Sequence, residues 1–301
     1  MFRNLTMFRF PAEAVTAFEH LHAKLAANPL HPCSPMQMRT RGWVSPYGQT
    51  DDATVLAQGD YRLITLGGWD KSIPASAVEA ELAERVKALE AARSVPIRNS
   101  ERRTIKRLIV DEMCVRAIAK PMRLHGMIDL RDGWLVVDTA SGKAAEDFVS
   151  ALRLALGSLN AFVIEPDTCP SDILTRWLAS GRGDGGWNLG GECELRDKIS
   201  DAVARFTGTD LTDDEVRSLI AHGMACTKLA VRHDDRCAMV LNRDLRVSKF
   251  QMSNIALKDL HRSEDESPRD VVESAAALLF GEVAVVLAAL ERSFAIPRPT
   301  V

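Results

Sequence analysis

The longest apolar stretch of this sequence runs from Ser274 to Leu290 and is interrupted by Glu282. It is shorter than the roughly 18 uncharged apolar residues that a membrane-spanning helix needs. Ser267-Pro268 is a typical helix start, so the pattern predicts a long helix that continues to about Phe294. A helix with so few polar positions has to be covered, and we expect it to pack in a core or in a subunit interface.

The composition is that of a folded chain. Of 301 residues, 46% are hydrophobic and 26% are charged, a balance that allows a sizeable core and argues against wholesale disorder. Arg3 and Arg9 bracket what would have to be the apolar stretch of a secretory signal, so we expect a cytoplasmic protein. The six cysteines form no Cys-x-x-Cys pair, which favours buried thiols over a zinc site or a disulfide framework.

The first part of the chain mixes strand and helix patterns. Residues 3–10 alternate as a strand, and apolar residues then recur at helical spacing from Pro11 to Ala27. Residues 28–60 are rich in Pro, Gly and polar side chains and predict a loop with short strands near Trp43. A further strand is expected at residues 61–66.

Two helices joined by a break are predicted next. The first follows Pro74 and has an apolar stripe formed by Val78, Leu82, Val86 and Leu89. Pro96 interrupts the pattern, Ser100 can cap the second helix, and Pro121 ends it. The inward-facing residues expected on the second helix are Ile105, Leu108, Ile109 and Met113. The two helices are predicted to form a projecting hairpin.

The remaining elements combine strands with helices. An Asp132-Gly133 turn is predicted to join two strands, and Thr212–Glu215 has the spacing of a capping box for a helix that Gly223 ends. Further strands are expected at residues 127–130, 134–139, 226–231, 237–241 and 245–251, and further helices at 143–156 and 173–178. These elements predict an α+β fold with antiparallel sheets and packed helices, without a βαβ repeat.

Basic residues gather in one segment although the chain has a net charge of −3. Between Arg93 and Arg123 nine basic residues oppose three acidic ones, whereas residues 192–217 and 258–273 are acidic. Residues three and four apart share a helix face, so a basic ridge is predicted at Arg102, Arg103, Lys106 and Arg107. Such a ridge fits a surface that faces a polyanion, or simply a solvated helix face.

The sequence contains no complete catalytic motif. Ser141-Gly142-Lys143 is the closest fragment to a phosphate-binding loop, but it lacks the first glycine and the hydroxyl residue after the lysine. The stretch Gly181–Gly191 could bring backbone amides near a phosphate or form a flexible surface loop. His20 and His22 stand two apart and cannot share a helix face as metal ligands. We therefore predict no catalytic residue, no metal and no cofactor.

Short stretches spread in order from residue 2 to about 230 resemble one known family. They are Phe2–Leu5 with Phe8-Arg9, Gly42–Pro46 with Gly48, Ile73–Val78, Val137–Ser141, Ala144 with Glu146-Asp147, Leu156–Leu159, Glu192–Asp197, Asp210–Thr212 and Thr227–Ala230. The ordered set resembles the bacterial recombination-associated RdgC family, with matching length to the C-terminus.

The resemblance implies a function and an assembly. It implies a ring-shaped homodimer that binds double-stranded DNA with little sequence preference, leaves single-stranded binding open, and restrains RecA-promoted recombination on the nucleoid. In that family the inner wall of the ring is basic. A helical gate closes the ring where an apolar residue of one subunit meets a pocket on the other. The matching residue here is Ile118. The alternative interpretation is that Ile118 is an ordinary residue of the core.

The resemblance and the charge pattern together give a candidate site. The expected phosphate contacts are Arg98, Arg102, Arg103, Lys106, Arg107, Arg116, Lys120 and Arg123. Phosphate contacts carry no base information, which fits binding without sequence preference. Before Asp210 the family often has basic and amide residues where this chain has Thr207-Gly208-Thr209, with Arg205 the nearby base, so the resemblance carries no DNA contact over to these three positions.

The domain division follows from the same reasoning. We expect a central α+β domain of residues 1–73 and 124–165, a helical gate or tip segment of residues 74–123, and a C-terminal α+β base domain of residues 166–301. Two rival functions are open. One is a small-molecule enzyme that binds a phosphorylated ligand at Gly181–Gly191, and the other is an adaptor whose basic ridge docks on an acidic protein.

Overall fold

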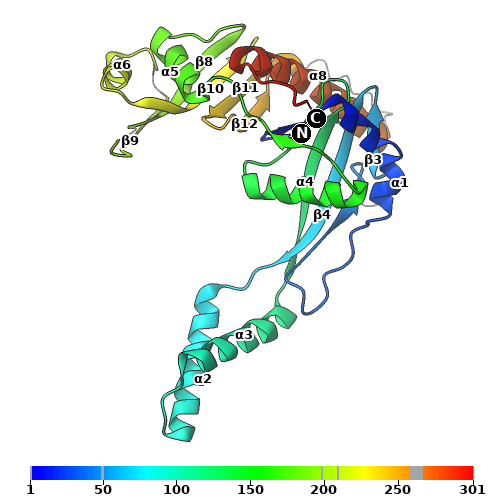
Figure 1. Cartoon of the computed structure of the whole chain (residues 1–301), viewed down its shortest axis with the longest axis vertical. Coiled ribbons are helices and arrows are strands. Elements are labelled where there is room, and N and C mark those ends of the chain that lie inside the picture. The colour runs from blue at the N-terminus through cyan, green and yellow to red at the C-terminus, as the bar shows by residue number, and fades with distance from the viewer. Residues whose placement is uncertain (1, 49–50, 198, 209, 258–266, 301) are drawn as a thin grey trace. The chain divides into compact units, whose positions relative to one another are not determined.

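The computed structural model describes residues 2–48, 51–197, 199–208, 210–257 and 267–300, and it has an α+β fold with two antiparallel sheets, as predicted (Figure 1). The chain divides into two compact units. Unit 1 contains Met1–Ala27, Val44–Thr65 and Leu124–Val301, and unit 2 contains Asn28–Trp43 and Leu66–Arg123. The three-domain division expected from the sequence remains a prediction.

The first sheet has seven strands in the described chain, in the order β2-β4-β5-β6-β1-β7 with β3 beside β4. The strands are β1 (Thr6–Arg9), β2 (Arg39–Val44), β3 (Val55–Gln58), β4 (Tyr61–Lys71), β5 (Ala119–Asp129), β6 (Trp134–Val137) and β7 (Phe162–Val163). The strands β5 and β6 form the hairpin predicted from Asp132-Gly133, with Asp129 opposite Trp134 and Gly133 at φ 75°. The strand β3 was not predicted separately from its loop.

The prediction of one continuous helix from Pro11 to Ala27 is wrong. A 3-10 helix η1 (Ala12–Phe18) and a short helix α1 (Leu21–Ala26) replace it. The chain breaks between them because His20 adopts a left-handed conformation with φ 57°, which a continuous helix does not allow. The apolar period survives the break, since Phe18, Leu21 and Leu25 are all buried.

The second sheet has five strands in the described chain, in the order β12-β11-β10-β8-β9. These are β8 (Trp187–Arg196), β9 (Val203–Thr207), β10 (Ala225–His233), β11 (Cys237–Asn242) and β12 (Val247–Met252). The predicted meander of three strands is confirmed, with Asp234 and Asp235 at positive φ in its first turn. The strands β8 and β9 were missed because β8 begins inside the glycine-rich stretch.

Four more helices of unit 1 are α4 (Gly142–Leu156), α5 (Pro170–Ser180), α6 (Asp214–Ala221) and α7 (Asn254–Leu257). The first three were predicted, and Gly223 follows α6 as expected. The capping box at Thr212–Glu215 is wrong, because the N-cap of α6 is Asp213 and the Thr212 hydroxyl donates to Asp210 instead. Ser141 caps α4 by accepting from the Ala144 amide.

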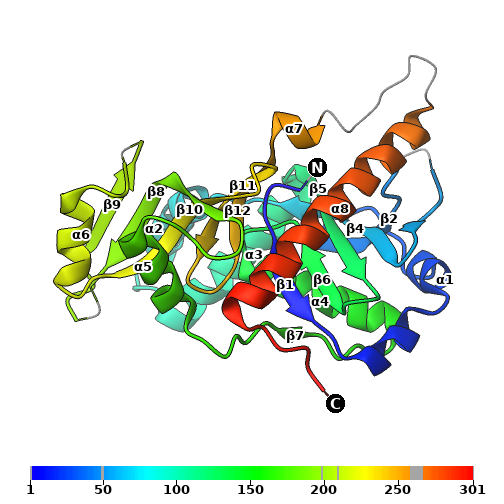
Figure 2. The same cartoon turned by 90° about the horizontal axis from the view of Figure 1, so that it is seen from above.

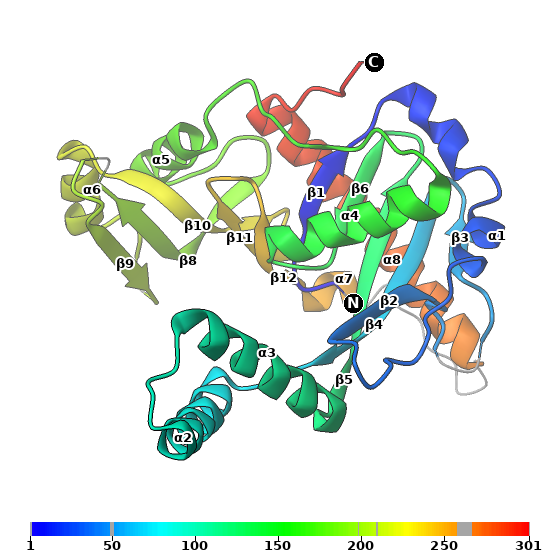
Figure 3. The ribbon, with the colours of Figure 1, turned by 60° about the horizontal axis from the view of Figure 1, so that its bottom comes forward.

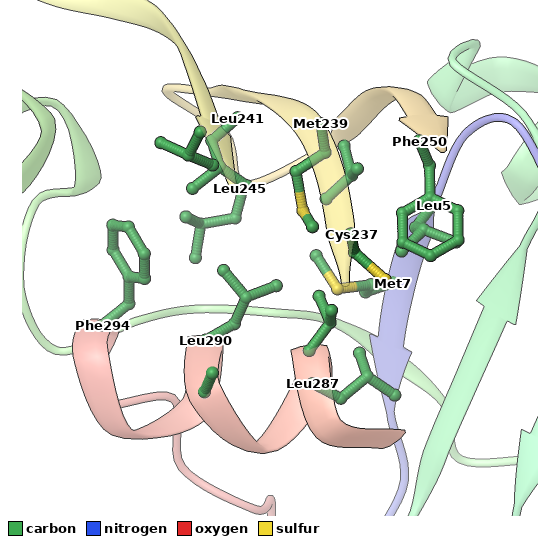
Figure 4. Packing of buried hydrophobic residues seen from close by; sticks show 14 of the residues in the cluster. Leu5, Met7, Cys237, Met239, Leu241, Leu245, Phe250, Leu287, Leu290 and Phe294 are labelled. Carbon is green, nitrogen blue, oxygen red and sulfur yellow. The ribbon is translucent and has the colours of Figure 1, made fainter. Parts of the chain in front are cut away.

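The long terminal helix α8 (Pro268–Phe294) forms as predicted and contributes its apolar side to the core of unit 1 (Figure 2). It starts with a true capping box between Ser267 and Asp270. Figure 4 shows Leu287 and Leu290 pointing toward residues of β1 and β11 in a common apolar cluster. By length and composition α8 could span a membrane. Its buried Glu282 is instead paired with Arg236, as a core helix requires.

Candidate nucleic-acid interface

The basic segment lies in unit 2 on a pair of helices, α2 (Ala75–Arg93) and α3 (Asn99–Arg116), which pack against each other as a helical hairpin (Figure 3). The hairpin has a small core in which Val78, Leu82 and Ile109 are buried. Ile105 and Met113 pack against this core as predicted, but Leu108 is 51% exposed and does not face inward. Ser100 is not the cap of α3, because the helix already begins at Asn99.

Three ion pairs cross between the two helices. Arg93 Nη1 lies 2.5 Å from Glu101 Oε1, Arg85 Nη2 lies 2.6 Å from Glu112 Oε2, and Lys106 pairs with Glu79. All three are largely exposed to solvent, so each adds little to stability. Their effect on charge matters more, because Arg85, Arg93 and Lys106 are each opposed by a carboxylate.

Four arginines, one at the N-cap of α3 and three within the helix, keep their charge exposed. Arg98, Arg102, Arg103 and Arg107 are all exposed, and within the described residues no acidic side chain forms an ion pair with them. Arg103 and Arg107 are four apart and therefore lie on one side of the helix. These guanidinium groups form a row of donors that is available to an external anion.

Lys106 differs from the rest of the predicted ridge. Its ammonium donates a hydrogen bond to Glu79, and this bond, with the charges of Lys106 and Arg102, lowers the pKa of Glu79 below its ordinary value. Glu79 therefore stays ionised and holds Lys106 in place. The sequence placed Lys106 among the free cations, and no pattern in α3 alone could reveal its partner on α2.

The helix α3 ends earlier than predicted, at Arg116, and Lys120, Pro121 and Arg123 lie on β5. The pairing of β6 with β5 covers Gly126–Asp129 and does not reach Pro121, so the missing amide of the proline costs no hydrogen bond to β6. Arg116, Lys120 and Arg123 are exposed. The predicted contacts thus continue from the helix onto the strand that follows it.

Ile118, the candidate gate residue, is 82% exposed in the short connection between α3 and β5. The alternative that it is an ordinary core residue is therefore wrong for the single chain. Val115 is also 53% exposed. Single exposed apolar residues are ordinary on protein surfaces, so this exposure leaves Ile118 available to a partner without identifying one.

Basic residues of the five-stranded sheet are held differently. Arg205, Glu194 and Lys228 stand opposite one another on β9, β8 and β10. The Glu194 carboxylate accepts from Arg205 at 2.9 Å, from Lys228 at 3.1 Å and from the Thr227 hydroxyl at 3.0 Å. Burial alone would raise the pKa of Glu194, but these hydrogen bonds outweigh it and lower the pKa to about 2.

The stretch at residues 207–209 carries no added base. Thr207 ends β9, Gly208 follows with φ 72°, and Thr209 lies outside the described residues. Arg205, the nearby base, is bound to Glu194. The departure from the family pattern thus leaves this edge of the sheet with a neutralised arginine.

Only the first half of the glycine-rich stretch is a surface turn, because the strand β8 begins at Trp187. Its glycines allow close packing, since a Cβ at Gly183 would lie 2.5 Å from Trp187 and one at Gly190 would lie 2.8 Å from Ala230. Asp184 accepts from the Trp177 indole at 3.1 Å. A Cβ at Gly186 would lie 2.6 Å from an Asp234 carboxylate oxygen. The carboxylates in this turn do not suit a phosphate, which disfavours the enzyme hypothesis.

Within the described residues there is no group of three or more His, Cys, Asp or Glu side chains placed to hold a metal ion. The buried thiols expected from the sequence are present at Cys114, Cys193, Cys226 and Cys237, whereas the expectation is wrong for Cys169, which is exposed, and for Cys33, which is half-buried. Burial raises the pKa of Cys193 to about 11 and that of Cys237 to about 12. These thiols stay protonated near neutral pH and are poor nucleophiles.

Comparison with known proteins gives one consistent result. A family model described as "Putative exonuclease, RdgC" matches residues 1–296. The chain is 33% identical over 293 residues to "Recombination-associated protein RdgC" of Xanthomonas axonopodis pv. citri (strain 306), with 96% of each chain covered. Proteins with the same description from Xanthomonas campestris pv. campestris (strain B100) and Xylella fastidiosa (strain M12) are 34% and 33% identical over 293 and 292 residues, again covering 96% of each chain.

Proposed function

The chain belongs to the RdgC family of recombination-associated proteins, and from this premise we propose that it is a non-enzymatic protein that binds DNA without sequence preference. The observation that carries the proposal is the set of exposed arginines on α3, Arg102, Arg103 and Arg107, which form no ion pair within the described residues. Guanidinium groups replace the counterions that surround the phosphates of DNA, and the released ions favour binding at low salt. Every phosphate is alike, so these contacts do not read sequence.

We further propose that two copies form a ring around duplex DNA and that Ile118 closes it. The exposure of Ile118 supports this role, because its side chain is available to a second copy. A closed ring links the protein topologically to the DNA, so weak phosphate contacts from both copies act together. Occupation of duplex on the nucleoid would restrain RecA-promoted strand exchange by denying access to the homologous DNA.

Binding of a linear duplex at several salt concentrations tests the electrostatic part of the proposal. We expect the logarithm of affinity to fall linearly with the logarithm of salt concentration, with a slope of about −0.9 for each phosphate contact. An affinity that does not depend on salt, or that depends strongly on sequence, would contradict it. Saturable binding of ATP or a sugar phosphate without affinity for duplex would support the enzyme hypothesis instead.

Retention on closed circular DNA tests the gate. The variant Ile118→Asp places a charge where an apolar contact is expected, so we expect retention on circles after a rise in salt to fall by about tenfold. Binding to linear duplex at low salt should change little, because no cation is removed. Retention equal to that of the unsubstituted protein would exclude Ile118 as the gate residue.

A further inference from the structure

One lysine side chain joins three segments at the base of the helical hairpin. Lys71 is the last residue of β4, just before α2. Its Nζ donates to the carbonyl oxygens of Ser34 at 3.0 Å, Pro35 at 2.7 Å and Cys114 at 3.0 Å. An ammonium group has three N–H donors. All three are therefore used on backbone acceptors from two distant parts of the sequence.

One of these acceptors belongs to the last turn of α3. The final carbonyl groups of a helix lack partners within the helix, and a positive charge there is also favourable to the helix dipole. The Cys114 carbonyl accepts from Lys71 and from the Ala117 amide, at 3.3 Å, directly before Ile118. Lys71 thus holds the end of α3 four residues before the candidate gate residue.

The other two acceptors belong to a turn with its own hydrogen bonds. The Ser34 amide donates to the Gln37 side chain at 3.0 Å, and the Gln37 amide donates to the Ser34 carbonyl at 3.1 Å. The Lys71 backbone amide donates to the Met38 carbonyl at 2.8 Å. Both the main chain and the side chain of Lys71 therefore fix this turn, which makes it a firm support for the ammonium group.

We propose that Lys71 is a positioning residue that fixes the direction in which α3 joins β5. The chain enters the hairpin directly after Lys71 and leaves it at Ala117 and Ile118. The hydrogen bond from Lys71 to Cys114 links the place where the chain enters the hairpin to the place where it leaves. This link restrains rotation of the hairpin relative to β4 and β5. This inference rests on the proposed function, because a fixed hairpin matters there by keeping Ile118 and the arginines of α3 in a geometry that two copies can close.

Hydrogen exchange tests the link without any DNA. The variant Lys71→Met keeps the length of the side chain but removes its donors, and Lys87→Met removes an exposed lysine of α2 as the matched control. We expect exchange at the amides of Gln37 and Ala117 to rise by about tenfold in Lys71→Met and to stay unchanged in Lys87→Met. Lys71→Arg, which keeps charge and donors, should restore at least part of the protection. Unchanged exchange in Lys71→Met would overturn the proposal.

Retention on circular duplex tests the functional part. Lys71→Met should lower retention after a rise in salt by about tenfold, while its affinity for linear duplex falls no more than that of Lys87→Met. Faster exchange with normal retention would show a structural link without a positioning role and would overturn the proposal. If the unsubstituted protein itself shows no preference for circles, the proposed ring fails, and the exchange experiment still decides whether Lys71 fixes α3.

Discussion

The arginines of α3 and four basic residues in or beside the five-stranded sheet carry the same charge but are held in opposite ways, although Arg232 on β10 is exposed and forms no ion pair within the described residues. On the sheet Lys249 lies 2.6 Å from Glu192, Arg246 donates to Asp244 at 2.6 Å, and two further bases share Glu194. On α3 the guanidinium groups of Arg103 and Arg107 have no such carboxylate in the described chain. A cation that already pairs with a carboxylate displaces few of the counterions that surround a polyanion. The number of basic residues is thus a poor guide to a DNA surface, and their partners decide it.

The largest test of this comparison reverses the charge of the ridge. Replacing Arg102, Arg103, Lys106 and Arg107 by Glu removes up to three phosphate contacts per copy, since Lys106 is already paired with Glu79, and adds four repulsive charges. At physiological salt we expect the affinity for duplex to fall by about a thousandfold or more, since each contact contributes roughly fivefold there. A gel-shift titration measures this effect. Unchanged binding would remove α3 from the site.

A matched pair of double variants compares the two regions directly. Arg103→Gln with Arg107→Gln removes two unopposed cations, whereas Arg205→Gln with Lys249→Gln removes two that face Glu194 and Glu192. We expect the salt slope to become shallower by about 1.8 per copy in the first variant and by less than half of that in the second. Equal changes in slope would show that pairing with carboxylates does not determine which basic residues contact DNA.

The third test concerns the role of the paired cations in folding. Because the pKa of Glu194 in the fold is about 2, well below the ordinary 4.5, its ionised form stabilises the native state above pH 4.5. This contribution is lost as the pH falls from 4.5 toward 2. Its upper limit is about 3 kcal/mol. The exposure of Arg205 and Lys228 reduces it, so we expect Glu194→Gln to lower the free energy of unfolding by about 2 kcal/mol at pH 7.

Urea unfolding at pH 7 and at successively lower pH measures this effect. The difference between the variant and the unsubstituted protein should shrink below pH 4.5, because the unsubstituted protein then loses the same charge. Glu192→Gln on the same strand is the control, since Glu192 is more exposed and has Lys249 as its ion-pair partner. A difference that stays constant as the pH falls would contradict the role of the Glu194 carboxylate.

Much of the fold follows from local sequence patterns. The apolar pattern before Phe294 predicts α8, the Asp132-Gly133 turn predicts the β5–β6 hairpin, and the stripe from Val78 predicts α2. In each case the local preference and the tertiary fold agree. The secondary-structure predictions fail where a single residue interrupts the element that the apolar pattern indicates. The left-handed His20 breaks a helix, and glycines that serve packing conceal the strand β8.

The candidate site shows a different limit. Its residues could be selected from charge and helical spacing, and the predicted arginines of α3 are exposed in the structure. Which of the cations remain unopposed depends on contacts between helices, as in the pair Lys106–Glu79. Lys71 gave no signal at all, because a single lysine after a strand is ordinary in sequence. Its role depends on carbonyl groups that lie about 36 and 43 positions away along the chain.

The smallest expected effect comes from releasing one paired cation. Glu79→Gln removes the carboxylate that holds Lys106, so the ammonium group becomes available to a phosphate. We expect affinity for duplex to rise by no more than about fivefold and the salt slope to steepen by about 0.9. Glu84→Gln, also on α2 and exposed, removes the same charge without releasing a cation and should raise affinity less, with little change in slope. If both variants behave alike, long-range repulsion outweighs pairing, and the contrast between α3 and the sheet would then reflect net charge.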